Sequence, residues 1–177
     1  MPLTINVDTY ITQVDATTYI GLTYATVSQE YITWTALSSG DKDLYLRKAC
    51  KKLDRQTLRG IKALATQTLE FPRAIRTDYY NVNYPNTTLR FTADWAVEES
   101  VSQAVKEAQV EEAITLATYG VQANKRIELQ NQGVKSFSLG NLSENYGTGI
   151  KAGTTKLLST NATELIRYYL LGAVGIV

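Results

Sequence analysis

The apolar residues of this chain recur mostly at three- and four-residue steps, a pattern that predicts amphipathic helices. A short first helix is expected within residues 17–29. The sequence Ser38-Ser39-Gly40-Asp41 matches a capping box, so a well-defined helix should begin there and end at Gly60. Its inner face would carry Leu46, Ala49, Cys50, Leu53 and Thr57.

A second long helix is predicted from Asp94 to Tyr119, because a broad stripe of mostly small apolar residues runs through it and Gly120 can end it. Between the two long helices, residues 65–94 contain two prolines and many Asn and Thr residues, which predicts an irregular but ordered excursion. Within it, Pro72 should force an extended turn, and Arg73 should bind a carboxylate or a carbonyl.

After Lys125 the pattern changes from a helical period to alternation. Residues 126–130 and 134–139 alternate on either side of an Asn-Gln-Gly turn, which predicts a β-hairpin, and a third strand can run from Leu142 to Tyr146. A glycine-containing link leads to a last helix, which should be capped by Thr160 or Asn161 and run through Leu171. The last eight residues, 170–177, contain no polar or charged side chain.

These elements predict a mainly α fold, a small helical bundle with a β-hairpin and a C-terminal helix and tail as an extension. We expect a helical body over residues 1–124, with the excursion at about 65–94, then the hairpin over 125–147 and the linker, helix and apolar tail over 148–177. The chain has 177 residues, 44% of them hydrophobic, so it can bury a real core. No stretch reaches the ~18 apolar residues of a membrane span, and no secretory signal pattern is present, so we expect no membrane partner.

The residue types argue against catalysis. The sequence contains no histidine and a single cysteine, Cys50. The commonest general base, the Ser/His triads, the His-based metal sites and the thiolate zinc clusters are therefore excluded. We expect no enzyme activity, no cofactor and no metal site, and an enzyme that runs on carboxylates or lysines ranks third among the functions considered.

Charge is nearly balanced overall but unevenly distributed. The sequence contains 18 Lys and Arg residues and 17 Asp and Glu residues, so it lacks the overall basic excess of a dedicated nucleic-acid binder. Residues 41–62 hold eight basic and three acidic residues, whereas residues 94–112 hold one basic and six acidic residues. The two long helices are therefore expected to carry opposite charge.

Several short motifs occur in a characteristic order along the chain. They are Asp15–Ile20, Tyr31–Ser38, Arg47–Asp54, Gln67–Arg73, Val105–Ala113 and Val134–Gly140. Their order and spacing resemble the head-tail connector (adaptor) family of tailed bacteriophages, including members described as DnaT-like single-stranded DNA-binding proteins. In the fourth motif, Gln-Thr-Leu-Glu-Phe-Pro-Arg, Phe71 stands where that family typically has Trp.

The resemblance implies a structural virion protein without chemistry. Such a connector forms a homo-oligomeric ring, usually a dodecamer, under the portal, extends the DNA channel and joins the capsid to the tail for viral genome ejection. The implied partners are other copies of the chain, the portal protein and a tail completion or stopper protein, with DNA only as passing cargo. The implied location is the neck of the virion, at the head-tail interface, and the host cytoplasm during assembly.

The opposite charges of the two long helices admit several interpretations. In a ring they could join neighbouring subunits, with basic residues on one side and acidic ones on the other: Lys48, Lys51, Lys52 and Arg55 against Glu107, Glu111 and Glu112. They could instead be two solvated helix faces, or the acidic helix could line a DNA channel. In the alternative function, a single-stranded DNA-binding accessory protein, the same basic residues with Tyr45 nearby would form a nucleic-acid stripe.

Aromatic and apolar residues suggest further contacts. Trp34, Phe71 and Trp95 are expected to anchor the core or a loop. Three tyrosines of the excursion suit contacts with the tail or a neighbouring subunit, unless their loop packs on its own domain: Tyr79, Tyr80 and Tyr84. The apolar end of the chain is expected to dock on the portal, with burial inside its own domain as the alternative. Its proposed contacts are Ile166, Tyr169, Leu170, Leu171, Val174, Ile176 and Val177.

Overall fold

The computed structural model describes residues 3–77, 94–131, 136–139, 142–145 and 157–171. The helices in these ranges are α1 (Gln13–Thr23), α2 (Gln29–Ala36), α3 (Ser39–Asp54), α4 (Gln103–Asn131), α5 (Thr160–Leu165) and the 3-10 helix η1 (Arg167–Tyr169). The strands are β1 (Ile61–Lys62), β2 (Arg73–Thr77), β3 (Asp94–Val97), β4 (Ser136–Leu139) and β5 (Leu142–Asn145). The predicted mainly α class is confirmed.

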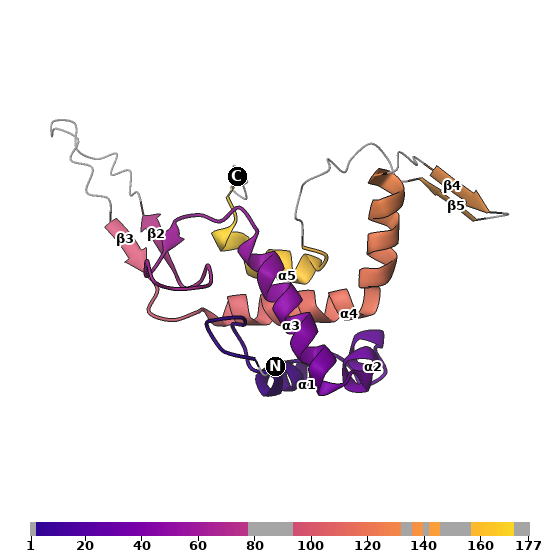
Figure 1. Ribbon diagram of the computed structural model, residues 1–177, viewed down its shortest axis with the longest axis horizontal. Coiled ribbons are helices and arrows are strands. Elements are labelled where there is room, and N and C mark those ends of the chain that lie inside the picture. The colour runs from indigo at the N-terminus through magenta and orange to yellow at the C-terminus, as the bar shows by residue number, and fades with distance from the viewer. Residues whose placement is uncertain (1–2, 78–93, 132–135, 140–141, 146–156, 172–177) are drawn as a thin grey trace.

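Helix α4 is the central element. Helices α1, α2, α3 and α5 all contact it, and α3 crosses over it (Figure 1). Its buried alanines, Ala108 and Ala113, let the neighbouring helices approach closely. Toward its end α4 turns away from the body, and the β4–β5 hairpin lies beyond that end (Figure 1). Among the described residues, no helix combines the length and the apolar character needed to cross a membrane.

Hydroxyl side chains set the starts of four helices. Thr12, Ser28, Ser38 and Ser159 each accept a hydrogen bond from a backbone N–H of the first turn that follows. The predicted start of α3 is confirmed, because Ser38 Oγ accepts from the Asp41 N–H at 3.1 Å. The predicted cap of the last helix, Thr160 or Asn161, is wrong by one residue or two, since Ser159 holds that position.

Several predicted boundaries are wrong. Helix α3 ends at Asp54, and Gly60 instead turns the chain into β1 with a φ of 74°. Residues 94–97 form β3 and not the start of a helix, because they pair with β2. The last helix ends at Leu165, and η1 follows it.

The predicted stop of α4 is also wrong, because Gly120 lies inside the helix, which continues to Asn131. Residues 126–130 are therefore helical and do not form the first hairpin strand. The observed hairpin pairs β4 with β5, in the register Ser136 to Asn145. The two strands predicted at residues 134–139 and 142–146 are thus the ones that pair.

The segment between α3 and α4, which includes the predicted excursion, contains an antiparallel sheet with the strand order β1-β2-β3. Ala74 pairs with both Ile61 and Val97, which places β2 in the middle. The Phe71–Pro72 peptide bond at the predicted turn is cis.

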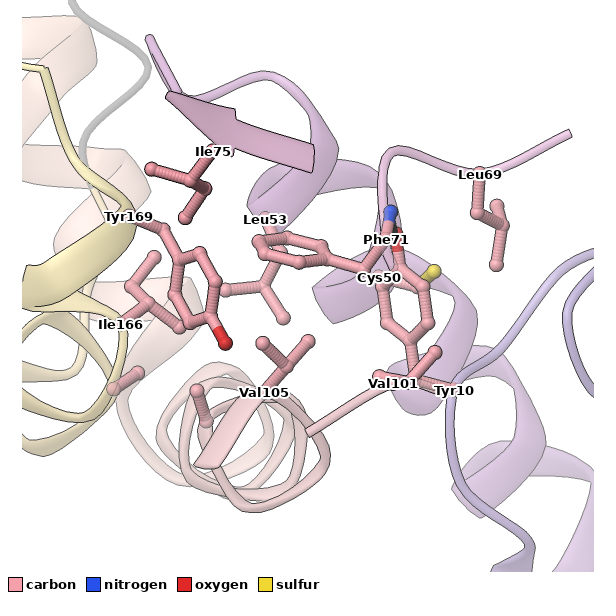
Figure 2. Packing of buried hydrophobic residues seen from close by; sticks show 12 residues of the cluster. Tyr10, Cys50, Leu53, Leu69, Phe71, Ile75, Val101, Val105, Ile166 and Tyr169 are labelled. Atoms are coloured by element: carbon pink, nitrogen blue, oxygen red, sulfur yellow. Dashed lines mark hydrogen bonds between the residues drawn. The ribbon is translucent and has the colours of Figure 1, made fainter. Parts of the chain in front are cut away.

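The apolar core has two clusters. In the first, the Phe71 ring lies edge-on between Tyr10 and Tyr169, with ring centres 5.6 and 5.0 Å away (Figure 2). The second cluster surrounds the fully buried Trp34. Phe71 and Trp34 are therefore core anchors as predicted, whereas Trp95 is 43% exposed on β3.

Candidate nucleic-acid interface

Helix α3 carries a positively charged outer face. Lys48, Lys51 and the C-cap residue Arg55 are exposed and follow one another at steps of three and four residues. Because Arg55 keeps a helical backbone conformation, the three share one side of the helix. We call these three residues the basic stripe. Residues 44–59 contain six basic residues and one acidic residue, Asp54, whose carboxylate accepts the Tyr10 hydroxyl. Two of the six basic residues are paired with carboxylates, Arg47 with Asp8 and Lys52 with Glu112, so the positive charge at this surface comes mainly from the basic stripe.

Aromatic rings accompany the cations at the start of this segment. The Lys48 ammonium lies 5.2 Å from the centre of the Tyr45 ring, a cation-π contact. Tyr45 therefore lies next to Lys48, as predicted. Lys42, one turn before Tyr45, makes a similar contact with Trp34 at 5.7 Å.

Lys52 does not belong to the exposed stripe. Its ammonium lies 2.8 Å from Oε1 of Glu112, whose side chain is fully buried. Glu112 also accepts the backbone N–H groups of Leu158 and Ser159, at 2.8 and 2.9 Å from Oε2. The predicted charge pairing between α3 and α4 thus occurs for this pair, but inside one chain and not between subunits.

Glu111 is buried as well, at 1% exposure. It accepts hydrogen bonds from the Tyr19 and Tyr24 hydroxyls, at 2.9 and 2.7 Å, and from the Asn161 amide at 3.2 Å. Only Glu107 of the three predicted acidic contacts is partly accessible, and it accepts from Gln103. Glu111 and Glu112 are therefore not available to a second subunit, because the chain's own elements cover them.

The C-terminal segment folds back on the body. Ile166 and Tyr169 are buried in the first core cluster, and Leu170 packs against it. The predicted assignment of these three residues to a portal interface is corrected, since their partners lie in the same chain. Leu171 is 62% exposed. Three further predicted contacts, Val174, Ile176 and Val177, lie outside the described residues, as do the tyrosines Tyr79, Tyr80 and Tyr84.

Backbone pairing joins this segment to the residues that follow α3. Leu58 and Leu170 form an antiparallel bridge, the Arg59 N–H donates to the Tyr169 carbonyl at 2.7 Å, and the Leu171 N–H donates to the Thr57 carbonyl at 2.9 Å. Figure 1 shows the yellow C-terminal segment beside the end of α3. The pairing brings an exposed tyrosine, Tyr168, to the end of the basic stripe.

Arg59 and Tyr168 form a second cation-π pair there. The guanidinium carbon of Arg59 lies 5.6 Å from the centre of the Tyr168 ring, and Nη1 donates to the Tyr168 carbonyl at 3.4 Å. This pair was not predicted from the sequence. The two residues are 109 positions apart, so no local pattern links them.

Arg73 fixes the backbone on which Arg59 sits. Arg73 is only 4% exposed, and its guanidinium donates to the carbonyls of Arg59 and Gly60, at 2.7 and 2.8 Å, and to Glu70 Oε2 at 2.7 Å. This confirms the prediction that Arg73 binds a carboxylate or a carbonyl. The cationic and aromatic groups at the end of α3 therefore stand on a rigid support.

Comparison with known proteins gives one family. The family model described as “Putative DnaT-like ssDNA binding protein” matches residues 3–175. The comparison with curated proteins and the comparison with solved structures returned no match.

This match corrects the head-tail connector interpretation, because no connector family is found. The expected ring under the portal, the portal and stopper partners and the role of DNA as passing cargo are therefore wrong. The predicted location in the virion neck and the host cytoplasm rests on the connector resemblance alone and stays a prediction. With nearly its whole length matched, the chain belongs to the family of putative DnaT-like single-stranded DNA-binding proteins.

Proposed function

We propose that this protein binds single-stranded DNA through the basic stripe of α3. The observation that carries the proposal is the set of three exposed cations, Lys48, Lys51 and Arg55, on one side of α3 and its C-cap. Cations in such a row neutralise successive phosphates and release the counterions condensed on DNA. The description of the family, which names single-stranded DNA binding, supports the same function.

The dimensions of the stripe suit a short stretch of backbone. Lys48 and Arg55 are seven residues apart, which corresponds to about 10 Å along a helix. Its three cations can each neutralise a phosphate of a strand that runs along the helix. Binding of this kind needs no particular base sequence, because only the phosphates are contacted.

The proposed role is binding without catalysis. The absence of histidine from the sequence supports it, because the commonest general base is missing. Incubation of end-labelled DNA with the protein and Mg²⁺ should leave the DNA intact, and cleavage of the DNA would contradict this part of the proposal.

Fluorescence anisotropy with a labelled thymidine oligonucleotide tests the binding function. The stripe variant replaces Lys48, Lys51 and Arg55 by Gln. The control variant removes the same charge elsewhere by replacing Lys62, Lys106 and Lys125 by Gln. We expect the stripe variant to bind at least about 10-fold more weakly, because about three phosphate contacts are lost, and the control to change by less than about 3-fold.

Two results would contradict the proposal. If the wild-type protein does not bind the oligonucleotide at low salt, the protein is not a single-stranded DNA-binding protein. If the two triple variants lose affinity equally, binding reflects overall charge and the stripe is not the site.

A further inference from the structure

We propose that Tyr168, with Arg59 beside it, is the position at which this protein stacks an unpaired nucleobase, and that this contact makes the binding selective for single strands. The inference rests on the proposed function, because it adds a base contact to the phosphate contacts of the basic stripe. It concerns residues that come from two distant parts of the chain and meet at the end of α3.

The position of Tyr168 fits this role. Its side chain is 56% exposed, whereas its neighbour Tyr169 is buried. Arg59 is four residues beyond Arg55, the last residue of the stripe, and its guanidinium carbon lies 5.6 Å from the Tyr168 ring centre. A DNA strand that follows the stripe would therefore reach a cation and an exposed ring together.

Both groups are held in place before any ligand binds. The Tyr168 ring contacts Tyr169 edge to face, with 5.3 Å between ring centres and 78° between the planes. The Arg59 backbone is fixed at both ends, since its N–H donates to the Tyr169 carbonyl and its carbonyl accepts from Arg73. A preordered platform loses little conformational entropy on binding, which favours its use as a contact site.

The chemistry of the pair explains a preference for single strands. Phosphates are present on duplex and single-stranded DNA alike, so the cations of the stripe do not distinguish them well. Base faces are covered by their neighbours in a duplex but are accessible in a single strand, where aromatic side chains stack on them. The Arg59 guanidinium reinforces such stacking through its own cation-π contact.

The other exposed aromatic rings suit the role less well. Tyr119 donates its hydroxyl to the carboxylate of Glu30 at 2.9 Å, and this negative charge repels phosphates. Trp95 lies on β3, which is the sheet edge opposite to β1, whereas Arg59 lies two residues before β1. Of the exposed rings in the described part of the chain, Tyr168 is thus the one that adjoins the stripe.

The test compares three probes of equal length: a thymidine oligonucleotide, an abasic oligonucleotide and a duplex. The variants are Tyr168→Ala and Tyr168→Leu, which lose the aromatic face, and Tyr168→Phe, which keeps it. We expect the Tyr168→Ala and Tyr168→Leu variants to bind the thymidine oligonucleotide about 5- to 50-fold more weakly than the wild type. Their binding of the abasic and duplex probes should be unchanged. Phe should retain wild-type affinity for all three.

Binding of the abasic probe and the duplex also reports that each variant is folded, and Leu preserves apolar bulk should Ala disturb Tyr169. If Ala and Leu bind the thymidine oligonucleotide as the wild type does while the stripe variant loses binding, the stacking inference is overturned and the proposed function stands. If the two substitutions reduce the affinity for all three probes equally, the Tyr168 ring supports the folded structure and does not contact a base, and the inference is again overturned. If the wild type binds none of the probes, both proposals fail.

Discussion

Lys52 and Glu112 form an ion pair across the interface of α3 and α4, with Nζ 2.8 Å from Oε1. The same carboxylate accepts the backbone N–H groups of Leu158 and Ser159, directly before α5. One buried side chain therefore joins three segments of the chain. Its loss would leave two backbone donors and a half-buried ammonium without their acceptor.

We expect Glu112→Ala to lower the free energy of unfolding by about 3 kcal/mol, the lower end for a broken buried pair, because Lys52 can turn toward water. Lys52→Ala should also destabilise the fold, because it leaves the fully buried Glu112 carboxylate without a counter-charge, although its two backbone hydrogen bonds remain. Urea denaturation measures both. The control is Glu107→Ala on the same helix, which should change stability by less than about 1 kcal/mol. If the Glu112→Ala variant unfolds at the same urea concentration as the wild type, this account is contradicted.

Gly60 and Gly21 offer a matched pair of substitutions. A Cβ added at Gly60 would lie 2.2 Å from the Ala74 carbonyl oxygen, and the residue has a φ of 74°. A Cβ at Gly21 would meet nothing within 4 Å. We expect Gly60→Ala to destabilise the fold by about 3 kcal/mol and Gly21→Ala to stabilise it by up to about 1 kcal/mol, because Gly21 lies inside α1. Thermal unfolding of the two variants would show this difference in sign, and equal melting temperatures would refute it.

Buried tyrosines make stability sensitive to alkaline pH. Burial, together with the hydrogen bond to Glu98, raises the pKa of Tyr169 to about 12 from an ordinary value of 10.0, and burial and the charge of Glu111 raise the pKa of Tyr19 to about 12. The pKa values of Tyr10 and Tyr24 are raised by burial and a carboxylate partner as well. Each of these hydroxyls donates to a carboxylate in the folded chain.

Above pH 10 the unfolded chain releases these protons and the folded chain keeps them, so the stability that is fully present below pH 10 should be lost as pH rises toward 12. The expected slope is up to about 1.4 kcal/mol per pH unit for Tyr169. Urea unfolding at a series of pH values measures it, and Tyr169→Phe should flatten the slope. Stability that stays constant from pH 9 to 12 would show that these tyrosines ionise alike in both states.

The salt dependence of DNA binding tests the number of phosphate contacts. For single-stranded DNA the logarithm of the binding constant falls with the logarithm of salt concentration by about 0.7 for each phosphate neutralised. Removal of Lys48, Lys51 and Arg55 should therefore reduce this slope by about 2. Anisotropy titrations between 50 and 200 mM salt, an order-of-magnitude range for this effect, give the slope. An unchanged slope would mean that other cations contact the strand.

Local signals in the sequence predicted some features well. Ser38 begins α3, and Leu46 and Leu53 lie on its buried face, because helix capping and apolar spacing are properties of a few neighbouring residues. The prediction that Arg73 binds a carboxylate or a carbonyl is also confirmed, because a guanidinium strongly favours such acceptors.

Features that depend on distant partners were not predicted. Residues 94–97 form a strand because β2 lies beside them. Gly120 did not end α4, since glycine inside a helix costs only about 1 kcal/mol and packing can offset this cost. The alternation of residues 126–130 was too short to exclude a helix.

The site itself was predicted only in part. The basic face of α3 is visible in the sequence, but the sequence does not show that Lys52 turns to Glu112. Glu111 and Glu112 are adjacent on a helix and therefore point about 100° apart, one toward Tyr19 and Tyr24 and the other toward Lys52. Which of them remain at the surface depends on the elements packed around α4, and these come from both ends of the chain.

The burial of Phe71 has a consequence for the protein during its synthesis. The Tyr10 side of the ring can be covered as soon as the first seventy or so residues are made, but the other side waits for Tyr169. At about 5 to 20 residues per second, the ribosome needs roughly 5 to 20 seconds to add the intervening residues. During that interval the side of the Phe71 ring that Tyr169 covers in the folded chain lacks this cover.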